Sequence, residues 1–314
     1  MKLGIDIGGT KTAAVVLDPH DKVIAHETTR SGSGPDAVLA AAVRIARRAI
    51  AEASLDDEEA RSLSVGACMP GLVDGATGTV LHAANLRVDR LELGPLLGAE
   101  LGLPVSVEND VKAAGLGARE ALCARSSRYA DLGLGYLNLG TGLAAAVVVD
   151  GEVVRGPRGA AGEIGHLPVG TGVPCSCGQT GCLETIASGS ALARLWPVPT
   201  PRPDPFVAAA AGDRRAAAAL HTLSDGIATA VQVLVFAAGV DLVVAGGGLT
   251  SLGEPLAEAV RDRLRERARR APVLAALDLP DRFELLVTAI PLAALGAAEL
   301  GGRARPTSAA GRLS

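Results

Sequence analysis

The chain has 314 residues, of which 48% are hydrophobic and 20% charged, and its formal net charge is −4. That length allows two domains with cores of their own, and the negative charge argues against a broad nucleic-acid surface. Because only 2% of the residues are aromatic and no apolar run is long enough to span a bilayer, we expect no nucleic-acid partner and no membrane span.

Three strands are predicted within residues 2–28. An apolar run reaches Asp6, a glycine turn follows, and apolar residues resume at 13–17 and 23–25. Glycine N–H groups can face a phosphate closely, so the turn is either a phosphate loop or a plain hairpin. Asp6, at the end of the first strand, is placed to hold Mg²⁺ through water. The loop residues are Gly8, Gly9, Thr10 and Lys11.

Helices and strands alternate in the next stretch. Residues 36–53 are rich in Ala and Arg at helical spacing, and residues 63–69 form a strand that ends at Pro70-Gly71. Residues 76–85 give a turn, a strand and Asn85. Such alternation is typical of an α/β fold.

Glu108-Asn109-Asp110 joins a strand at 105–107 to a helix at 113–120. Asp110 has two interpretations. As a helix cap it would accept hydrogen bonds from free N–H groups and interact with the helix dipole. As a general base it would take a proton from a substrate hydroxyl. Phosphate loops on both sides favour the base, because phosphoryl transfer needs a carboxylate to orient the attacking hydroxyl.

Residues 134–154 repeat the pattern of the first segment. An apolar strand leads to Gly140-Thr141-Gly142, and two more strands follow. The duplication predicts two similar domains that face each other, each with a phosphate loop. A third glycine loop, Gly246-Gly247-Gly248, ends a buried strand within residues 241–249, where α/β folds form ligand sites.

Residues 162–184 bring several metal ligands into one short stretch. Thiolate and imidazole are the ligands that zinc prefers, and four of them close a structural site without an open position for water. Gly178 and Gly181 allow the backbone to turn so that the sulfurs converge. Two carboxylates, Glu163 and Glu184, flank the stretch. The expected zinc ligands are His166, Cys175, Cys177 and Cys182.

Two other interpretations of these cysteines are reduced core thiols and a disulfide. Three cysteines within eight residues, separated by glycines, argue against core thiols. The chain begins without an apolar signal segment, so we expect a cytoplasmic location, which disfavours a disulfide. Cys68 and Cys123 lie in apolar stretches and are expected to be small core residues.

The remaining residues predict mostly helices. We expect helices at 185–195 and 206–239, with an irregular connection at 196–205, which holds five prolines. A charged helix at 254–270 is expected to be a solvated face. A last strand at 284–288, a helix at 292–300 and a disordered tail complete the chain.

These motifs together resemble the ROK family (repressors, open reading frames and sugar kinases) of the actin-like ATPase superfamily. The match covers residues 2–300, and the cysteine block is its most specific part. The strand that leads into the phosphate loop begins at Leu3, so we expect no helix-turn-helix domain of the family's repressor branch. The resemblance rests on residues 6–11, 108–110 with Ala113-Ala114, 140–142, 162–166 and 175–184.

The resemblance implies an α/β fold of two actin-like (ribonuclease H-like) domains around an interdomain cleft, with a structural zinc loop. Residues 1–115 would form the N-terminal domain, residues 116–301 the C-terminal domain, and residues 302–314 a disordered tail. ATP and a sugar would lie between the domains. Since the family leans toward dimers and tetramers, a homo-oligomer is expected.

The resemblance also assigns roles to single residues. Asp110 would be the catalytic base, Asp6 would sit near Mg²⁺, and His166 would contact both zinc and sugar. The sugar would be held by Gly71, Asn85, Asn109, Asp110, Glu163, His166 and Glu184. ATP would be held by Asp6, Gly8, Gly9, Thr10, Lys11, Gly140, Thr141, Gly142, Gly247 and Gly248.

The implied activity is ATP-dependent phosphorylation of a hexose, glucose first, most often at the 6-hydroxyl. An amino-sugar kinase acting on N-acetylglucosamine, N-acetylmannosamine or an unacetylated amino sugar uses the same chemistry. A sugar sensor without catalysis is a third hypothesis, which loss of Asp110 or of the glycine loops would favour; neither is lost. Residues 87–89 lack the aromatic side chain often found nearby in glucokinase-like members, so the sugar stays open.

Overall fold

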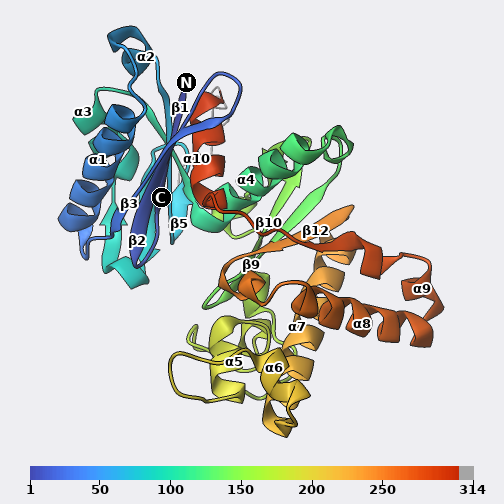
Figure 1. Ribbon diagram of the computed structural model, residues 1–314. Coiled ribbons are helices and arrows are strands. Elements are labelled where there is room, and N and C mark those ends of the chain that lie inside the picture. The colour runs from blue at the N-terminus through green and yellow to red at the C-terminus, as the bar shows by residue number, and fades with distance from the viewer. Residues whose placement is uncertain (304–314) are drawn as a thin grey trace. The chain divides into compact units, whose positions relative to one another are not determined.

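A computed structural model describes residues 1–303 of the chain (Figure 1). These residues form two compact units. Unit 1 contains Met1–Ser127, the short segment Arg155–Ala160 and the chain from Thr288 onward, and unit 2 contains Arg128–Val154 and Ala161–Val287. Of the predicted tail, residues 304–314 lie outside the described residues.

Unit 1 is built on a five-stranded mixed sheet. Its strands are β1 (Lys2–Ile7), β2 (Lys11–Leu17), β3 (Val23–Arg30), β4 (Ser64–Met69) and β8 (Val105–Asn109). They lie in the order β3-β2-β1-β4-β8. The first three are antiparallel neighbours, whereas β1, β4 and β8 run parallel. The carboxyl ends of these three parallel strands therefore meet at one edge.

In its described residues, unit 1 also contains a small sheet and five α-helices. The antiparallel sheet has the order β5-β6-β7, with β5 (Leu72–Asp74), β6 (Thr79–Ala83) and β7 (Val88–Leu91). The helices are α1 (Pro35–Glu52), α2 (Asp57–Arg61), α3 (Leu93–Leu101), α4 (Asp110–Arg125) and α10 (Leu292–Gly302). Sequence patterns predicted α1, α4 and α10 but not α2, α3, β5 or β7.

Glycines allow α10 to pack directly on the sheet and on α4. A Cβ on Gly66 of β4 would lie 1.8 Å from the carbonyl oxygen of Ala297, and one on Gly4 would lie 1.9 Å from that of Ala294. Gly117 and Gly296 allow an equally close approach between α4 and α10. Side chains at these positions would force the backbones apart. The close packing joins α10 to unit 1.

Unit 2 has the same sheet topology. Its strands are β9 (Leu134–Leu139), β10 (Leu143–Val149), β11 (Glu152–Val153), β12 (Leu242–Gly246) and β13 (Phe283–Leu285). Their order is β11-β10-β9-β12-β13, with three antiparallel strands followed by parallel neighbours. The repeat seen in the sequence is therefore a repeat of strand order and direction.

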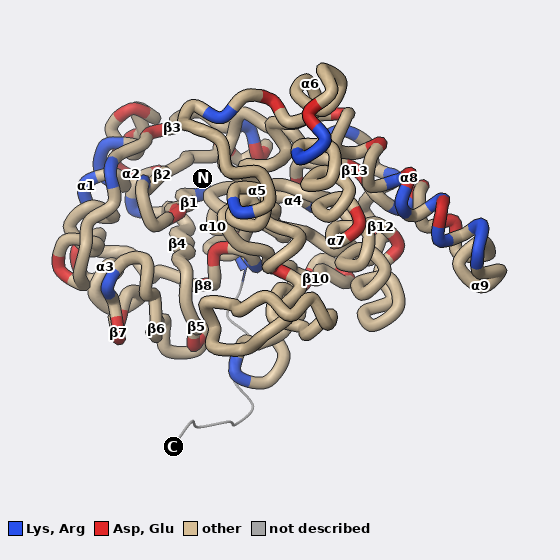
Figure 2. The backbone as a smooth tube through the Cα atoms, turned by 90° about the horizontal axis from the view of Figure 1, so that it is seen from below, with Lys and Arg blue, Asp and Glu red and all other residues tan. Residues whose placement is uncertain are grey.

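The described part of unit 2 also contains α-helices. They are α5 (Gly189–Leu195), α6 (Pro205–Ala210), α7 (Arg214–Ala238), α8 (Glu254–Arg270) and α9 (Pro272–Ala275). Basic and acidic residues alternate along α8 (Figure 2), where Arg265 pairs with Asp262 at 2.8 Å, so the expected charged surface face is confirmed. The core contains Leu223, Ile227 and Val231 of α7 beside Val243 of β12.

The helix α7 is long and apolar enough to cross a membrane by length and composition alone. Within its most apolar window, 61% of the residues are buried inside the unit. Such burial is what the core helix of a water-soluble domain shows.

Several local predictions need correction. The helix predicted at 185–195 begins only at Gly189, because Ser188 caps it and residues 183–185 form a separate 3₁₀ turn. The strand predicted at 284–288 is β13, which ends at Leu285. Gly302, placed in the tail, is helical. The bounds of the two compact units differ from the ranges 1–115 and 116–301 expected for the two domains. The division into two functional domains and the cleft between them stay predictions.

Candidate active site

The parallel strands of unit 1 place three chemically active side chains in one row. Asp6 of β1 pairs in register with Cys68 of β4, which pairs with Glu108 of β8. The Cys68 thiol is buried and donates to Asp6 Oδ1 at 3.8 Å. The predicted phosphate loop follows β1 directly and is closed by a 3.1 Å bond from the Gly8 N–H to the Lys11 carbonyl.

Asn109, not Asp110, is the N-cap of α4. Asn109 Oδ1 accepts hydrogen bonds from the N–H groups of Val111 and Lys112, at 3.0 and 3.2 Å. Asp110 is the first helical residue, and its Oδ1 accepts from Val111 N at 2.9 Å. Asn109 therefore supplies the cap that was considered for Asp110, and the interpretation of Asp110 as a base does not compete with capping.

Asp6 lies in an environment that disfavours its charge. Burial, together with the nearby negative charge of Asp110, raises the pKa of Asp6 to about 7, although the Cys68 thiol and Lys11 oppose the shift. Two carboxylates that interact in a poorly hydrated place would both be stabilised by a divalent cation. The donor set therefore fits the predicted magnesium ion, which stays a prediction.

Unit 1 brings the predicted sugar residues into contact with its other loops. A Cβ on Gly9 would lie 3.3 Å from the Asn85 Cβ, so Asn85 touches the phosphate loop. Gly71 has a φ of 113°, which favours glycine. Its carbonyl accepts from Asn109 Nδ2 at 3.2 Å. Both ends of the Asn109 amide are thus engaged within the protein, and its sugar contact stays a prediction.

Sequence patterns missed a set of contacts that anchor the segment 155–160. Arg155 Nε donates to Glu108 Oε2 at 2.6 Å, while Glu108 Oε1 accepts from the Asn109 N–H. Lys112 Nζ donates to the Gly159 carbonyl at 2.8 Å, and both Glu108 and Lys112 are only 3% exposed. A charged residue directly after the strand predicted at 105–107 is a signal that sequence analysis could have used. Its partner could not be found in this way, because Arg155 lies 47 residues from Glu108.

We predict that Arg155→Ala lowers the free energy of unfolding by roughly 2–4 kcal/mol, because it leaves the Glu108 carboxylate buried without its partner. Urea unfolding would measure the change. Arg158→Ala, on the same segment at an exposed position, is the matched control and should have little effect. The double variant Glu108→Gln/Arg155→Ala should be more stable than Arg155→Ala alone; equal stability would contradict the explanation.

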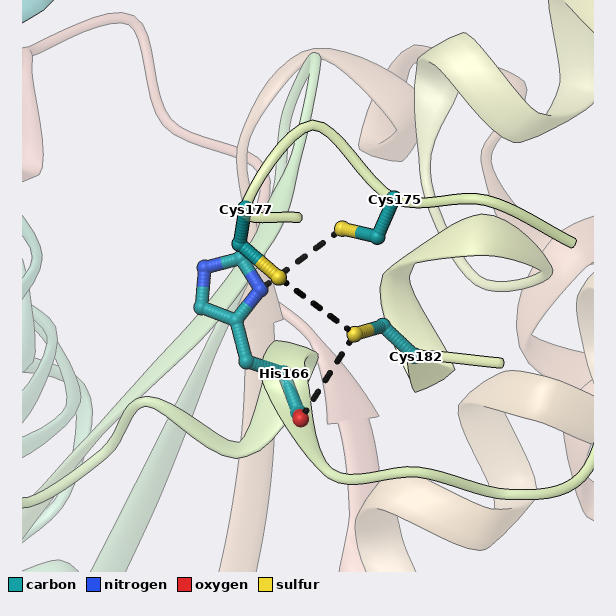
Figure 3. Close-up of side chains that lie close together, drawn as sticks. All are labelled: His166, Cys175, Cys177 and Cys182. Carbon is teal, nitrogen blue, oxygen red and sulfur yellow. Dashed lines mark hydrogen bonds between the residues drawn. The ribbon is translucent and has the colours of Figure 1, made fainter. Parts of the chain in front are cut away.

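In unit 2 the four predicted metal ligands converge (Figure 3). One ligand atom from each of His166, Cys175, Cys177 and Cys182 lies within 4.8 Å of the others. Cys177 Sγ lies 3.6 Å from Cys182 Sγ, and Cys175 Sγ lies 3.8 Å from His166 Nδ1. Tetrahedral zinc with thiolate ligands spaces its sulfurs roughly 3.8 Å apart. A disulfide would need about 2.0 Å, so the thiols are free and the cluster fits zinc.

The thiols of the cluster differ in their acidity. The Gln179 N–H is the main cause that lowers the pKa of Cys177 to about 7, and burial raises the pKa of Cys182 to about 12. A bound metal removes the thiol protons in any case, because only the thiolate is a ligand. Zinc itself stays a prediction.

Glu184 and Glu163 occupy different environments. Glu184 Oε2 accepts from the Leu143 N–H at 3.0 Å, and its Oε1 lies 3.7 Å from Cys175 Sγ. Glu163 is exposed, and among the described residues its carboxylate has no hydrogen-bond partner. His166 directs Nδ1 to the cluster. Its predicted contact with a sugar would therefore use Nε2, and that contact stays a prediction.

The two glycine loops of unit 2 meet at Asn138, which no sequence pattern identified. Asn138 of β9 pairs in register with Gly246, as Asp6 pairs with Cys68 in unit 1. A Cβ on Gly247 would lie 2.8 Å from Asn138 Oδ1, and one on Gly140 would lie 3.5 Å from its Nδ2. The equivalence to Asp6 through the repeated topology is the signal that could have found it.

Comparison with known proteins identifies relatives over most of the chain. The model of the ROK family matches residues 2–284. A glucokinase from Halalkalibacterium halodurans is 31% identical over 227 residues, which are 66% of this chain and 67% of that protein.

Two crystal structures of ROK proteins match nearly the whole fold. A ROK hexokinase from Thermus thermophilus has a TM-score of 0.78 and 30% identity, over 96% of this chain and 97% of that one. A ROK glucokinase from Streptomyces griseus, in complex with glucose and AMPPNP, has a TM-score of 0.70 and 27% identity, over 95% and 98%. The α/β fold with mixed sheets is therefore that of ROK kinase structures.

Proposed function

The chain belongs to the ROK family, and on that premise we propose that it is an ATP-dependent sugar kinase that transfers the γ-phosphoryl group to a hexose hydroxyl. Glucose, at its 6-hydroxyl, is the first candidate substrate. The observation that carries the proposal is the Asp110 carboxylate, which begins α4 and whose charge acts on Asp6, at the end of the strand that leads into the glycine loop of unit 1. A kinase needs such a carboxylate beside a phosphate loop.

Two relatives support a nucleotide and a hexose as the two substrates. The Streptomyces griseus structure was solved with glucose and AMPPNP, a nucleotide analogue, and the Halalkalibacterium halodurans relative is a glucokinase. We propose by this likeness that ATP is the phosphoryl donor and a hexose the acceptor.

In the proposed reaction Asp110 accepts the proton of the sugar hydroxyl while that oxygen attacks the γ-phosphorus. The bond from phosphorus to the bridging oxygen breaks, and ADP leaves. Backbone N–H groups of the loops Gly8–Lys11 and Gly140–Gly142 would stabilise the charge on the phosphoryl oxygens. The N–H groups of Gly8 and Gly140 are excepted, because they donate to carbonyls within their own loops. A positioned general base contributes about 10²- to 10⁴-fold to such a rate.

Mg²⁺, when bound, would neutralise phosphate charge, and Asp6 is the residue proposed to hold it through water. Zinc would be a structural ion held by His166 and the three cysteines. We propose that Asn85, Gly71 and Asn109 of unit 1, and Glu163, His166 and Glu184 of unit 2, hold the sugar. Gly247 and Gly248 would approach the nucleotide.

The free thiols of the cluster fit a reducing compartment, so we propose a cytoplasmic location. The absence of a nucleic-acid or membrane partner, and a homo-oligomeric state, stay predictions.

The function is tested by coupled measurement of ADP release from ATP and Mg²⁺ with the zinc-replete protein. The panel should contain glucose, mannose, fructose, N-acetylglucosamine, N-acetylmannosamine and glucosamine. We expect turnover with glucose. Turnover with an acetylated or free amino sugar alone would replace glucose by the amino-sugar alternative. Sugar binding by calorimetry without any ADP release would favour the sensor and contradict the kinase.

A further inference from the structure

Glu184 contacts both the metal cluster and the second glycine loop. Its Oε1 lies 3.7 Å from Cys175 Sγ, and its Oε2 accepts from the Leu143 N–H at 3.0 Å. The loop backbone also packs on the carboxylate, because a Cβ on Gly142 would lie only 2.3 Å from Oε2. One side chain thus joins two parts of unit 2 that have separate proposed roles.

A second set of contacts joins the same two parts through the start of α5. The Gly189 N–H donates to the Gly140 carbonyl at 2.8 Å, and the Ser190 N–H donates to the Thr141 carbonyl at 3.1 Å. The start of α5 therefore holds two carbonyl groups of the glycine loop, those of Gly140 and Thr141. The Gly140 N–H donates to the Gly142 carbonyl, so the N–H groups of Thr141 and Gly142 are the ones that the proposed function directs to phosphate.

The chain between the cluster and α5 is short and internally bonded. Thr185 Oγ1 donates to the Cys182 carbonyl at 2.6 Å. The buried Ser188 hydroxyl donates to the Glu184 carbonyl at 2.8 Å and accepts from the Ala191 N–H at 3.1 Å, which caps α5. Residues from Cys182 to Ser190 therefore form a continuous connection, here named the 182–190 link.

We propose that Glu184 and the 182–190 link are positioning elements that connect the Cys/His cluster to the loop Gly140–Gly142. The metal state of the cluster then sets the affinity for nucleotide phosphates as well as for sugar. This inference rests on the proposed function, since it assumes that the loop binds a nucleotide.

The physical reason is that a phosphate loop binds through several N–H groups whose directions must agree. Cys182 is one of the four ligands, and only Leu183 separates it from Glu184. Without a metal, only hydrogen bonds such as that from the Gly181 N–H to the Val173 carbonyl, at 2.8 Å, hold the stretch of Cys175 against that of Cys182. We therefore expect Glu184 to be less firmly held beside Leu143. Loss of the groups that orient metal ligands typically costs 10- to 100-fold in metal affinity or activity. By analogy we expect ADP affinity to fall about tenfold when the groups that orient the glycine loop are lost.

The first test measures ADP binding by calorimetry without sugar, so that no sugar contact contributes. Protein is compared as prepared with zinc, after zinc removal by a chelator under reducing conditions, and after zinc is added back. We expect ADP affinity to fall about tenfold on removal and to return with zinc. Equal ADP affinity with and without zinc, in protein whose circular dichroism is unchanged, would overturn the inference.

The second test keeps the metal and breaks the link. Ser188→Ala removes the cap of α5 together with the bond to the Glu184 carbonyl, while Asp204→Ala removes an equivalent cap from α6. Both variants should retain one zinc per chain by elemental analysis. We expect weaker ADP binding only for Ser188→Ala; an equal affinity in the two variants would contradict the link, even if zinc-free protein unfolds.

A conservative pair tests Glu184 itself. Glu184→Gln keeps an oxygen that can accept from the Leu143 N–H, whereas Glu184→Ala does not. ADP affinity should be largely retained in the first and reduced in the second, and equal loss in both would argue against this contact. If zinc-replete wild-type protein binds no ADP, the proposed function fails; if it binds ADP regardless of zinc and of Ser188, only the inference fails.

Discussion

Asp110→Asn is expected to remove turnover while sugar affinity stays nearly unchanged. The amide keeps the size and hydrogen-bonding capacity of the carboxylate but cannot take the hydroxyl proton, so kcat should fall about 10²- to 10⁴-fold. The fold should survive, because Asn109 caps α4. Loss of the first-turn charge costs only about 0.3–1 kcal/mol of helix stability. ADP release and sugar calorimetry measure the two effects.

Asp36→Asn is the matched control for this prediction. Asp36 is also an acid in the first turn of a helix of unit 1, but it lies on α1, and its substitution should leave turnover intact. A second readout is the pKa of Asp6, which the charge of Asp110 helps to raise. In Asp110→Asn that pKa should move down, though burial keeps it above the ordinary range. Retained turnover would refute the base.

Cys177→Ser is expected to lose zinc and sugar affinity together. A serine hydroxyl does not replace a thiolate as a zinc ligand, and the remaining three ligands would no longer fix the loop that carries Glu163 and His166. Cys177 is exposed, so the substitution itself should cost little packing. We expect at least a tenfold loss of sugar affinity, measured by calorimetry, with zinc content measured by elemental analysis.

The control is Cys123→Ser, which changes a thiol of α4 outside the cluster. It should keep both zinc and sugar affinity. A zinc-free Cys177→Ser protein that binds sugar as tightly as wild type would separate the metal from the sugar site. In that case the cluster would serve only the stability of unit 2.

The local elements of the site followed from short sequence patterns. Apolar runs around Gly8-Gly9 and Gly140-Thr141-Gly142 predicted both strand pairs and their loops, because side-chain periodicity and glycine turns act over a few residues. The four metal ligands were predicted for the same reason, since all four lie within the 17 residues from His166 to Cys182.

Contacts between distant residues were not predictable in this way. Asn109 caps α4 because its backbone is extended and the helix begins at Asp110. The spacing of residues in the sequence cannot show at which of these two residues the helix begins. The bond from Arg155 to Glu108 joins a segment that returns to unit 1 from between two stretches of unit 2. Glu184 was predicted only as a sugar ligand, whereas one of its oxygens accepts from Leu143.

The sequence alone determined the family, the α/β class, the glycine loops and the convergence of one histidine with three cysteines, because each depends on neighbouring residues. Only the tertiary structure decided that α10 completes unit 1, that Asp6, Cys68 and Glu108 share one row, and that Glu184 joins the cluster to a loop. Strand register and the close packing of glycine-bearing backbones arise from the fit of whole elements, and that fit is not encoded in any short stretch of the chain.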